Sequence, residues 1–157
     1  MERFAYRNKI RKMTKEKRNI TVTANSKIER VSDDMENIIF TADGTIEDDG
    51  KKITIKYTEP AGEQKRETKN VFTFEKDKRE EVTLSRQGGI NSLMMFKKGG
   101  RYSFTYDLGF ASLEMCTNTI DVLNSIDFHS GGRLGMNYVT ESRGVPMQKV
   151  KFTLTVK

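Results

Sequence analysis

Residues 82–89 read Val–Thr–Leu–Ser–Arg–Gln–Gly–Gly. Apolar and hydroxyl side chains alternate from Val82 to Ser85, a pattern typical of a β-strand with one face in a core. The two glycines that follow mark a turn. Arg86 occupies the position at which the alternation requires the next inward-facing side chain. The stretch therefore predicts a strand that ends in a hairpin turn and carries a charge on its apolar face.

The same period-two alternation continues on both sides of this stretch. Turn signals containing glycine, proline or clustered charges separate most of the alternating segments. The segment 111–122 is read as one strand or as two strands joined by a bulge. The expected strands lie at residues 20–28, 35–46, 53–59, 71–75, 82–86, 91–97, 102–106, 111–122, 134–138 and 150–156.

Two glycines carry specific local predictions. Asp49–Gly50 predicts a tight hairpin turn in which both residues have positive φ. Gly44, after Asp43, lies inside an expected strand, where a glycine suggests a β-bulge and a kink.

Nine or ten short strands in sequence, with no amphipathic helix after residue 18, predict an all-β fold. Sequential hairpins favour an antiparallel, mostly up-and-down barrel of about eight to ten strands, because closure removes exposed sheet edges. A β-sandwich is the alternative from the pattern alone. Neither an internal repeat nor a low-complexity segment is present.

Length and composition agree with one small barrel domain. The 157 residues are enough to bury a core without disulfides or metals. Charged residues make up 32% of the chain, as expected for a thin wall with one solvated face. No stretch approaches the roughly 18 apolar residues of a membrane helix, and the basic start lacks the apolar region of a signal peptide. We therefore expect a cytoplasmic protein without a membrane partner.

The net charge of +6 is concentrated at the N-terminus. Residues 1–18 hold eight basic and two acidic residues, whereas residues 19–157 hold twenty of each. The chain thus divides into a basic N-terminal segment, 1–18, and a barrel domain, 19–157. Three interpretations of the segment stay open: a solvated or packing tail, a biological start at Met13, and an arm that contacts nucleic-acid phosphates.

Signals of enzymatic chemistry are sparse. His129 is the only histidine and Cys116 the only cysteine, and neither belongs to a recognisable metal-ligand spacing. Cys116 lies in an alternating run and is interpreted as a passive thiol, and His129 as a turn residue, although a haem barrel would need one such axial ligand. We expect no catalytic residue, no metal and no cofactor, and hence a protein that is not an enzyme.

Arg86 and Glu59 form the candidate site. Both continue the apolar parity of their strands, so they point into the barrel or onto its mouth. An unpaired charge there would cost several kcal/mol. The alternatives are an Arg86–Glu59 ion pair, an arginine that reaches water at the strand end, and an arginine that binds an anionic group. In the last case Tyr57, Tyr102 and Tyr106 would line an amphipathic cavity.

Several motifs resemble the YwiB-like family of small bacterial proteins of unknown function, which are described as calycin-like β-barrels. The most specific match is the segment 82–88, Val–Thr–Leu–Ser–Arg–Gln–Gly, which continues through residues 91–99. The resemblance covers most of residues 19–157 and implies a calycin-like barrel, with no established activity to carry over. Further matching positions are the segment 41–44, Ile46, Gly50, Tyr57, Glu59, Tyr106, Leu113 and Thr117. The segment 107–111 departs from the short turn expected there.

These observations predict a non-catalytic barrel that binds a small amphipathic or anionic molecule, with Arg86 as the polar anchor. The alternative is an interaction or RNA-associated module that uses the basic segment, with the barrel as a filled scaffold. The aromatic residues follow the buried parity, which favours core packing over stacking with bases.

Overall fold

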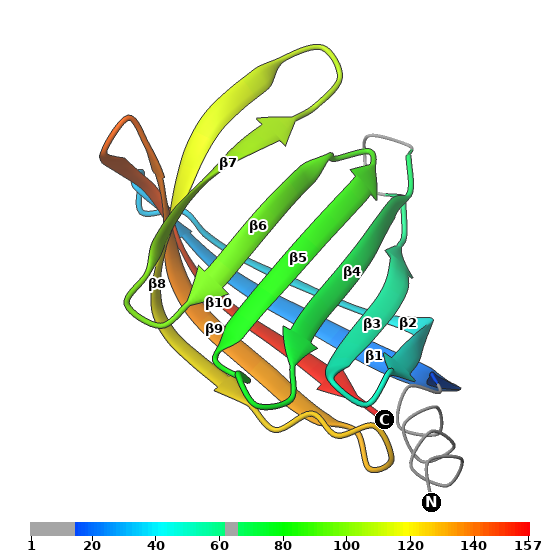
Figure 1. Cartoon of the computed structure of the whole chain (residues 1–157). Helices are drawn as coiled ribbons and strands as arrows, with labels where there is room; N and C mark the ends of the chain where they lie inside the picture. Colours follow the sequence, from blue (N-terminus) through cyan, green and yellow to red (C-terminus); the bar gives the residue numbers. More distant parts are fainter. Residues whose placement is uncertain (1–14, 62–65) are drawn as a thin grey trace, which may run out of the picture.

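A computed structural model describes residues 15–61 and 66–157, which form ten β-strands and, within these ranges, no helix (Figure 1). Most of the predicted basic segment, residues 1–14, lies outside the described ranges, and β1 begins at Glu16. The strands are β1 (Glu16–Arg30), β2 (Met35–Asp48), β3 (Lys52–Glu59), β4 (Thr68–Glu75), β5 (Glu81–Gly88), β6 (Ser92–Lys97), β7 (Arg101–Asp107), β8 (Ser112–Asn124), β9 (Gly132–Ser142) and β10 (Val145–Val156).

All strands belong to one antiparallel sheet, in the order β6-β5-β4-β3-β2-β1-β10-β9-β8-β7. Every neighbour is also a neighbour in sequence except the pair β1 and β10, whose ladder runs from Val22–Val156 to Arg30–Gln148. Within the described residues no ladder joins β6 to β7, but Asn91 and Asp107 exchange two backbone hydrogen bonds of 2.9 Å. The predicted all-β, up-and-down barrel is confirmed, and it is nearly closed.

Alternation places the apolar side chains of these strands in the interior. Neighbouring residues point to opposite faces of the sheet, so the even-numbered positions of β4, Phe72 and Phe74, are buried. Phe72 stacks on Phe152 of β10, with ring centroids 5.6 Å apart, and Phe96 of β6 contacts Tyr138 of β9 at 4.9 Å. These aromatic contacts span the barrel, and its interior holds one hydrophobic core.

The loop between β8 and β9 covers the lower end of the barrel. Its Ile126 is fully buried and its Phe128 nearly so, and both belong to the core. Arg79 donates a hydrogen bond of 2.5 Å to the Ile126 carbonyl, and Arg18 donates one to the Phe128 carbonyl while lying against its ring. The two arginines satisfy backbone oxygens that the loop conformation leaves without ladder partners.

Two local predictions need correction. In the turn at Asp49–Gly50, Gly50 has a φ of 91°, but Asp49 lacks a positive φ. The Asp49 carboxylate accepts hydrogen bonds from the N–H groups of Lys51 and Lys52, at 2.9 and 2.7 Å, and these bonds hold a longer turn. The bulge predicted at Gly44 is also wrong, because the β1–β2 register is unbroken there.

Gly44 instead permits the close approach of β3. A Cβ atom at this position would lie 2.4 Å from the Lys56 carbonyl oxygen and 3.1 Å from the Tyr57 Cβ.

The bulge considered for residues 111–122 is present. It lies within the single strand β8, as a register shift between Thr119 and Asp121.

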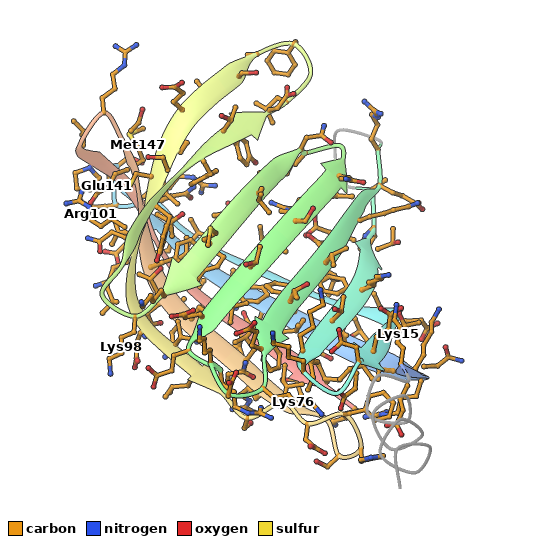
Figure 2. The ribbon with its side chains drawn as sticks, in the orientation of Figure 1. Lys15, Lys76, Lys98, Arg101, Glu141 and Met147 are labelled. Carbon is orange, nitrogen blue, oxygen red and sulfur yellow. The ribbon has the colours of Figure 1, made fainter. Side chains whose placement is uncertain are left out.

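Ion pairs lie on the outer wall and at the lower end of the barrel (Figure 2). Lys15 contacts Glu47 at 3.0 Å and Lys76 contacts Asp48 at 2.5 Å, both near the lower end. Arg101 of β7 pairs with Glu141 of β9, on either side of β8. Pairs with one exposed partner contribute little stability individually, so the interior determines the stability of the barrel.

We expect Ile126→Ala to lower the free energy of unfolding by about 2–5 kcal/mol, because it leaves a cavity between the loop and the core. Urea denaturation measures the loss. Ile120→Ala is the matched control, since half of the Ile120 side chain is exposed, and it should change stability by less than about 0.5 kcal/mol. Equal effects would show that the loop is not part of the core.

Candidate functional site

A row of side chains crosses four neighbouring strands near the end of the barrel at which β3 and β5 finish, the upper end in Figure 1. Tyr57, Asn70, Arg86 and Ser92 are successive cross-strand partners on β3, β4, β5 and β6. Residues directly opposite each other share one face of the sheet, and Tyr57 belongs to the core. The row therefore lies on the inner face. The alternating pattern of β5 predicted this inward direction for the Arg86 side chain.

Arg86 is held by two neighbours inside the barrel. Its Nη2 lies 2.8 Å from Glu59 Oε2, and its Nε donates a hydrogen bond of 3.1 Å to Asn70 Oδ1. The ion pair considered for Arg86 and Glu59 is therefore present. Their side chains are 18% and 30% exposed, respectively, so the pair is accessible to solvent. A guanidinium has five N–H donors, so these two bonds leave donors for a further oxygen ligand.

Two tyrosines lie close enough to the ion pair to feel its charges. Burial raises the pKa of Tyr57 well above its ordinary value, and the Glu59 carboxylate raises it further. Burial also raises the pKa of Tyr138 to about 12, against the opposing effect of the Arg86 charge, with Tyr106 adding to the rise. Both phenols are therefore harder to ionise than an ordinary tyrosine, which is itself protonated at neutral pH. The polar end of the barrel holds hydroxyl groups without additional negative charge.

The structure does not bring Tyr102 to Arg86. Tyr102 lies at the other end of β7, where its ring is next to Gly100 and lines a hollow together with Phe96 and Lys97. Successive inward positions on one strand are about 6.6 Å apart along its axis. Tyr102 is two such steps below Tyr106, and Tyr106 is followed by Asp107, which pairs with Asn91 beside Ser92 of the row.

Two further polar side chains adjoin Arg86, and both were absent from the sequence prediction. Asn70 is buried, and within the described residues its Nδ2 has no hydrogen-bond partner; the same holds for Ser92 Oγ. Asn70 lies one residue outside the predicted strand 71–75, yet it shares the parity of Phe72. Arg86 was identified because it is a polar residue at a position where the alternation expects an apolar one. The same signal would have identified Asn70 if the predicted strand 71–75 had been extended by one residue.

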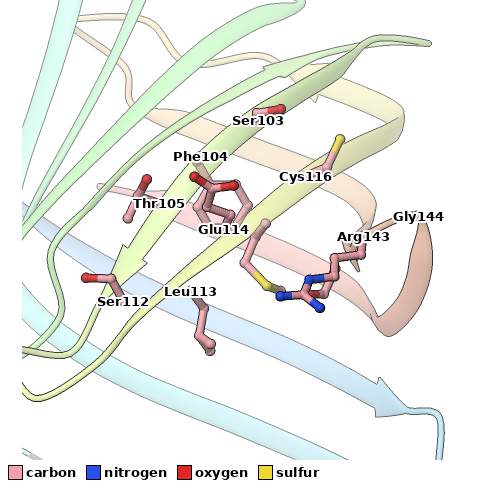
Figure 3. A pocket seen from close by; sticks show the side chains of 11 residues that line it. Ser103, Phe104, Thr105, Ser112, Leu113, Glu114, Cys116, Arg143 and Gly144 are labelled. Carbon is pink, nitrogen blue, oxygen red and sulfur yellow. The ribbon is translucent and has the colours of Figure 1, made fainter.

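A separate hollow of about 860 Å³ lies on the outer wall beside the β7–β8 hairpin (Figure 3). Its lining includes Ser103, Glu114, Cys116 and the exposed Arg143 of the β9–β10 turn. Cys116 shares the outward parity of Glu114, in agreement with its interpretation as a thiol on a strand. The hollow is partly open to solvent.

Metal-binding arrangements are absent from the described residues: no group of three or more His, Cys, Asp or Glu side chains converges there. His129 is exposed in the β8–β9 loop, where its backbone N–H donates to Asp127 Oδ2 at 3.1 Å. This placement agrees with its interpretation as a turn residue. No helix in the described part of the chain is long and apolar enough to cross a membrane.

Comparison with known proteins identifies a family and a fold. The profile of a family described as "Domain of unknown function (DUF1934)" matches residues 20–154. The crystal structure of the ywiB protein from Bacillus subtilis superimposes with a TM-score of 0.77 at 22% sequence identity, covering 90% of this chain and 92% of that chain. The likeness shows a common barrel fold. No curated protein matches the chain.

We expect a double-mutant cycle between Arg86→Met and Glu59→Gln to give a coupling energy of about 1–2 kcal/mol, because the pair is partly shielded from water. Unfolding in urea measures each variant. The exposed pair Lys97–Glu81, 3.2 Å apart, is the control and should couple by less than about 0.5 kcal/mol. Similar coupling in both pairs would contradict the enclosed position of Arg86.

Alkaline titration should reveal the buried tyrosines. The pKa of Tyr138 is about 12 in the folded chain and about 10 in an unfolded one. Between these values only the folded state keeps the proton, so stability should fall as pH rises from about 10 to about 12. Tyrosinate absorbance measures the ionisation, and Tyr138→Phe should remove one late step. Identical titration curves for folded and urea-unfolded protein would contradict this assignment.

Proposed function

Since the chain belongs to the DUF1934 family, for which no activity is described, we propose a function from the geometry of its barrel: binding of a small anionic molecule at the upper end, with Arg86 as the anchor. One observation carries this proposal. An arginine faces the interior of a barrel, is oriented by Glu59 and Asn70, and keeps unused donors at a position that solvent reaches.

The surroundings of Arg86 favour an oxyanion as the partner. Planar guanidinium donors match carboxylate and phosphate oxygens. Glu59 balances the charge of the guanidinium in the unliganded barrel and fixes its orientation, which lowers the entropic cost of binding. Tyr57 and Tyr138 are neutral at pH 7, as tyrosines ordinarily are, so their hydroxyls do not repel an anion as phenolates would.

Binding without turnover is the role we assign to this site. General acid–base catalysis near neutral pH requires a group whose pKa lies close to the working pH. Tyr57 and Tyr138 are shifted away from that range by burial. Glu59 is engaged by Arg86. Binding of an anion requires no change in these groups: the two phenols stay neutral, and Glu59 stays paired with Arg86.

Native mass spectrometry of the protein purified from its own cell type tests the proposal. We expect a retained anionic molecule in the unmodified protein and at least a tenfold lower occupancy in Arg86→Met, which keeps most of the side-chain volume but removes the charge-assisted hydrogen bonds, each contributing about 1.5–3 kcal/mol. Arg133→Met, on the exposed surface near the lower end, should retain the molecule as the unmodified protein does.

Two results would overturn the proposal. One is equal retention in Arg86→Met and in the unmodified protein. The other is no retained mass in either protein, together with no thermal stabilisation by a panel of simple carboxylates and phosphates.

A further inference from the structure

Two aromatic side chains on the inner face of the barrel are partly exposed, although they lie between buried neighbours. Phe152 of β10 has Val150 and Leu154 as its neighbours on this face, and these are 5% and 0% exposed. Tyr138 of β9 lies in the same way between two buried residues of its own strand. An inward-pointing side chain in the middle of a strand meets solvent only inside the barrel. Phe152 and Tyr138 therefore border an internal space that solvent reaches.

The two rings are neighbours on adjacent strands. Phe152 lies opposite Met136, and Tyr138 lies opposite Val150. The two aromatic residues are thus diagonal neighbours on one face, a separation within the reach of aromatic side chains. Burial raises the pKa of Tyr138 to about 12, so its phenol lies deep among protein groups. A side chain that is deep and still partly exposed borders an internal space and not the outer surface.

This space extends to Arg86. Leu84 of β5 precedes Arg86 by one inward step, about 6.6 Å, and its side chain is only partly buried. Phe72 is the cross-strand partner of Leu84, and it stacks on Phe152 with ring centroids 5.6 Å apart. The Arg86 charge also acts on the phenol of Tyr138. Partly exposed apolar groups of β5, β9 and β10 therefore lie around the guanidinium.

Phe40 of β2 adds a third ring beside the ion pair. Its ring centroid is 6.1 Å from that of Tyr57, whose phenol feels the charges of Glu59 and Arg86. Phe40 is only partly buried and packs against the core. We call the partly exposed inner side chains near Arg86 the aromatic wall, because three of its four members are rings. They are Phe40, Leu84, Tyr138 and Phe152.

The lower end of the interior offers no comparable exposed surface. The stack of Phe72 on Phe152, with 20° between the ring planes, separates the aromatic wall from the core below it. Ile126 and its loop cover the lower end. A molecule that enters from the upper end must therefore be small. Large inward-facing side chains of the lower end are at most 2% exposed: Ile46, Ile53, Phe74, Val82 and Leu134.

We propose that the molecule anchored by Arg86 is a small aromatic oxyanion, in which a planar ring system carries one carboxylate or phosphate group. This inference rests on the proposed function and narrows it. Arg86 binds the anionic group, and the aromatic wall packs on the ring system. Offset-stacked and edge-to-face aromatic pairs strengthen binding about three- to tenfold beyond the area that they bury. Tyr57, Phe72 and Phe152 already form a stacked series, with successive centroids 6.2 and 5.6 Å apart, which a ligand ring would extend.

Isothermal titration calorimetry with the full chain tests the inference. The probes are 2-naphthoate and 2-naphthyl phosphate, the saturated decalin analogue of each, acetate and inorganic phosphate. At least one naphthyl probe should bind about 100-fold more tightly than the corresponding ring-free anion, because its body leaves water for an apolar surface. It should also bind at least about threefold more tightly than its decalin analogue, which has the same carbon skeleton but is not planar.

The comparison of the two naphthyl probes identifies the anionic group. Arg86→Met should weaken the tighter naphthyl probe at least tenfold, because it removes the charge-assisted hydrogen bonds.

Phe152→Leu is the decisive variant, because it removes a ring and keeps an apolar side chain. It should weaken the tighter naphthyl probe about three- to tenfold and leave the affinity for inorganic phosphate unchanged. Phe40→Leu serves as a second variant if Phe152→Leu is poorly folded. Phe74→Leu is the matched control: it makes the same change on the inner face, at a side chain of the lower end that is 2% exposed. It should alter neither affinity.

The possible failures are distinguishable. Arg86-dependent binding of acetate or phosphate with no gain from a ring, or equal affinity for a naphthyl probe and its decalin analogue, would overturn this inference and leave the proposed function standing. Unchanged naphthyl affinity in both Phe152→Leu and Phe40→Leu would also overturn it, as would an equal loss in Phe74→Leu, since a general loosening of the barrel would then explain the effect. No binding of any anionic probe, or naphthyl binding that Arg86→Met leaves unchanged, would overturn both proposals.

Discussion

The ladder between β1 and β10 converts a meander of ten strands into a barrel. It joins strands from opposite ends of the described chain, and it removes the two longest edges that the sheet would otherwise expose. Closure also defines an inside, so that every second residue of each strand is committed to one shared volume. The remaining seam lies between β6 and β7, where backbone bonds at Asn91 and Asp107 hold the strands together at one end.

The shared volume is divided between an apolar and a polar end. Below, the aromatic side chains of β4, β6 and β10 pack across the barrel, and the β8–β9 loop adds Ile126 to this core. Above, Arg86 and Glu59 occupy positions that alternation would otherwise give to apolar residues. A chain that only needed a stable scaffold would gain little from charges there, since well-packed apolar residues are often as stable as an enclosed ion pair.

Membership of the DUF1934 family and the likeness to ywiB from Bacillus subtilis account for the fold. They do not account for the side chains at the upper end, because a common fold carries many unrelated functions. An anion site would depend on this chain's own groups at the upper end. These are a guanidinium with unused donors, phenols whose pKa values are raised by burial, and the Asn70 Nδ2 and Ser92 Oγ atoms, which have no partner in the described residues.

Alternation was enough to predict the strands and the inward direction of Arg86 and Glu59, because the side-chain period of a strand is a local property. The up-and-down barrel was favoured by the sequential turns, whereas the pattern alone left a sandwich open. The turn at Asp49 was mispredicted because its carboxylate accepts hydrogen bonds from the next N–H groups and holds a longer turn. The role of Gly44 was mispredicted because it depends on the close approach of β3. Tyr102 shares the parity of Tyr106 but lies farther down β7, a difference in height that parity does not encode. The tertiary structure alone decided that Tyr138 of β9 lies close enough to Arg86 of β5 for the guanidinium charge to act on its phenol. More than fifty residues of chain separate Tyr138 from Arg86, and only closure of the barrel brings such distant strands around one interior.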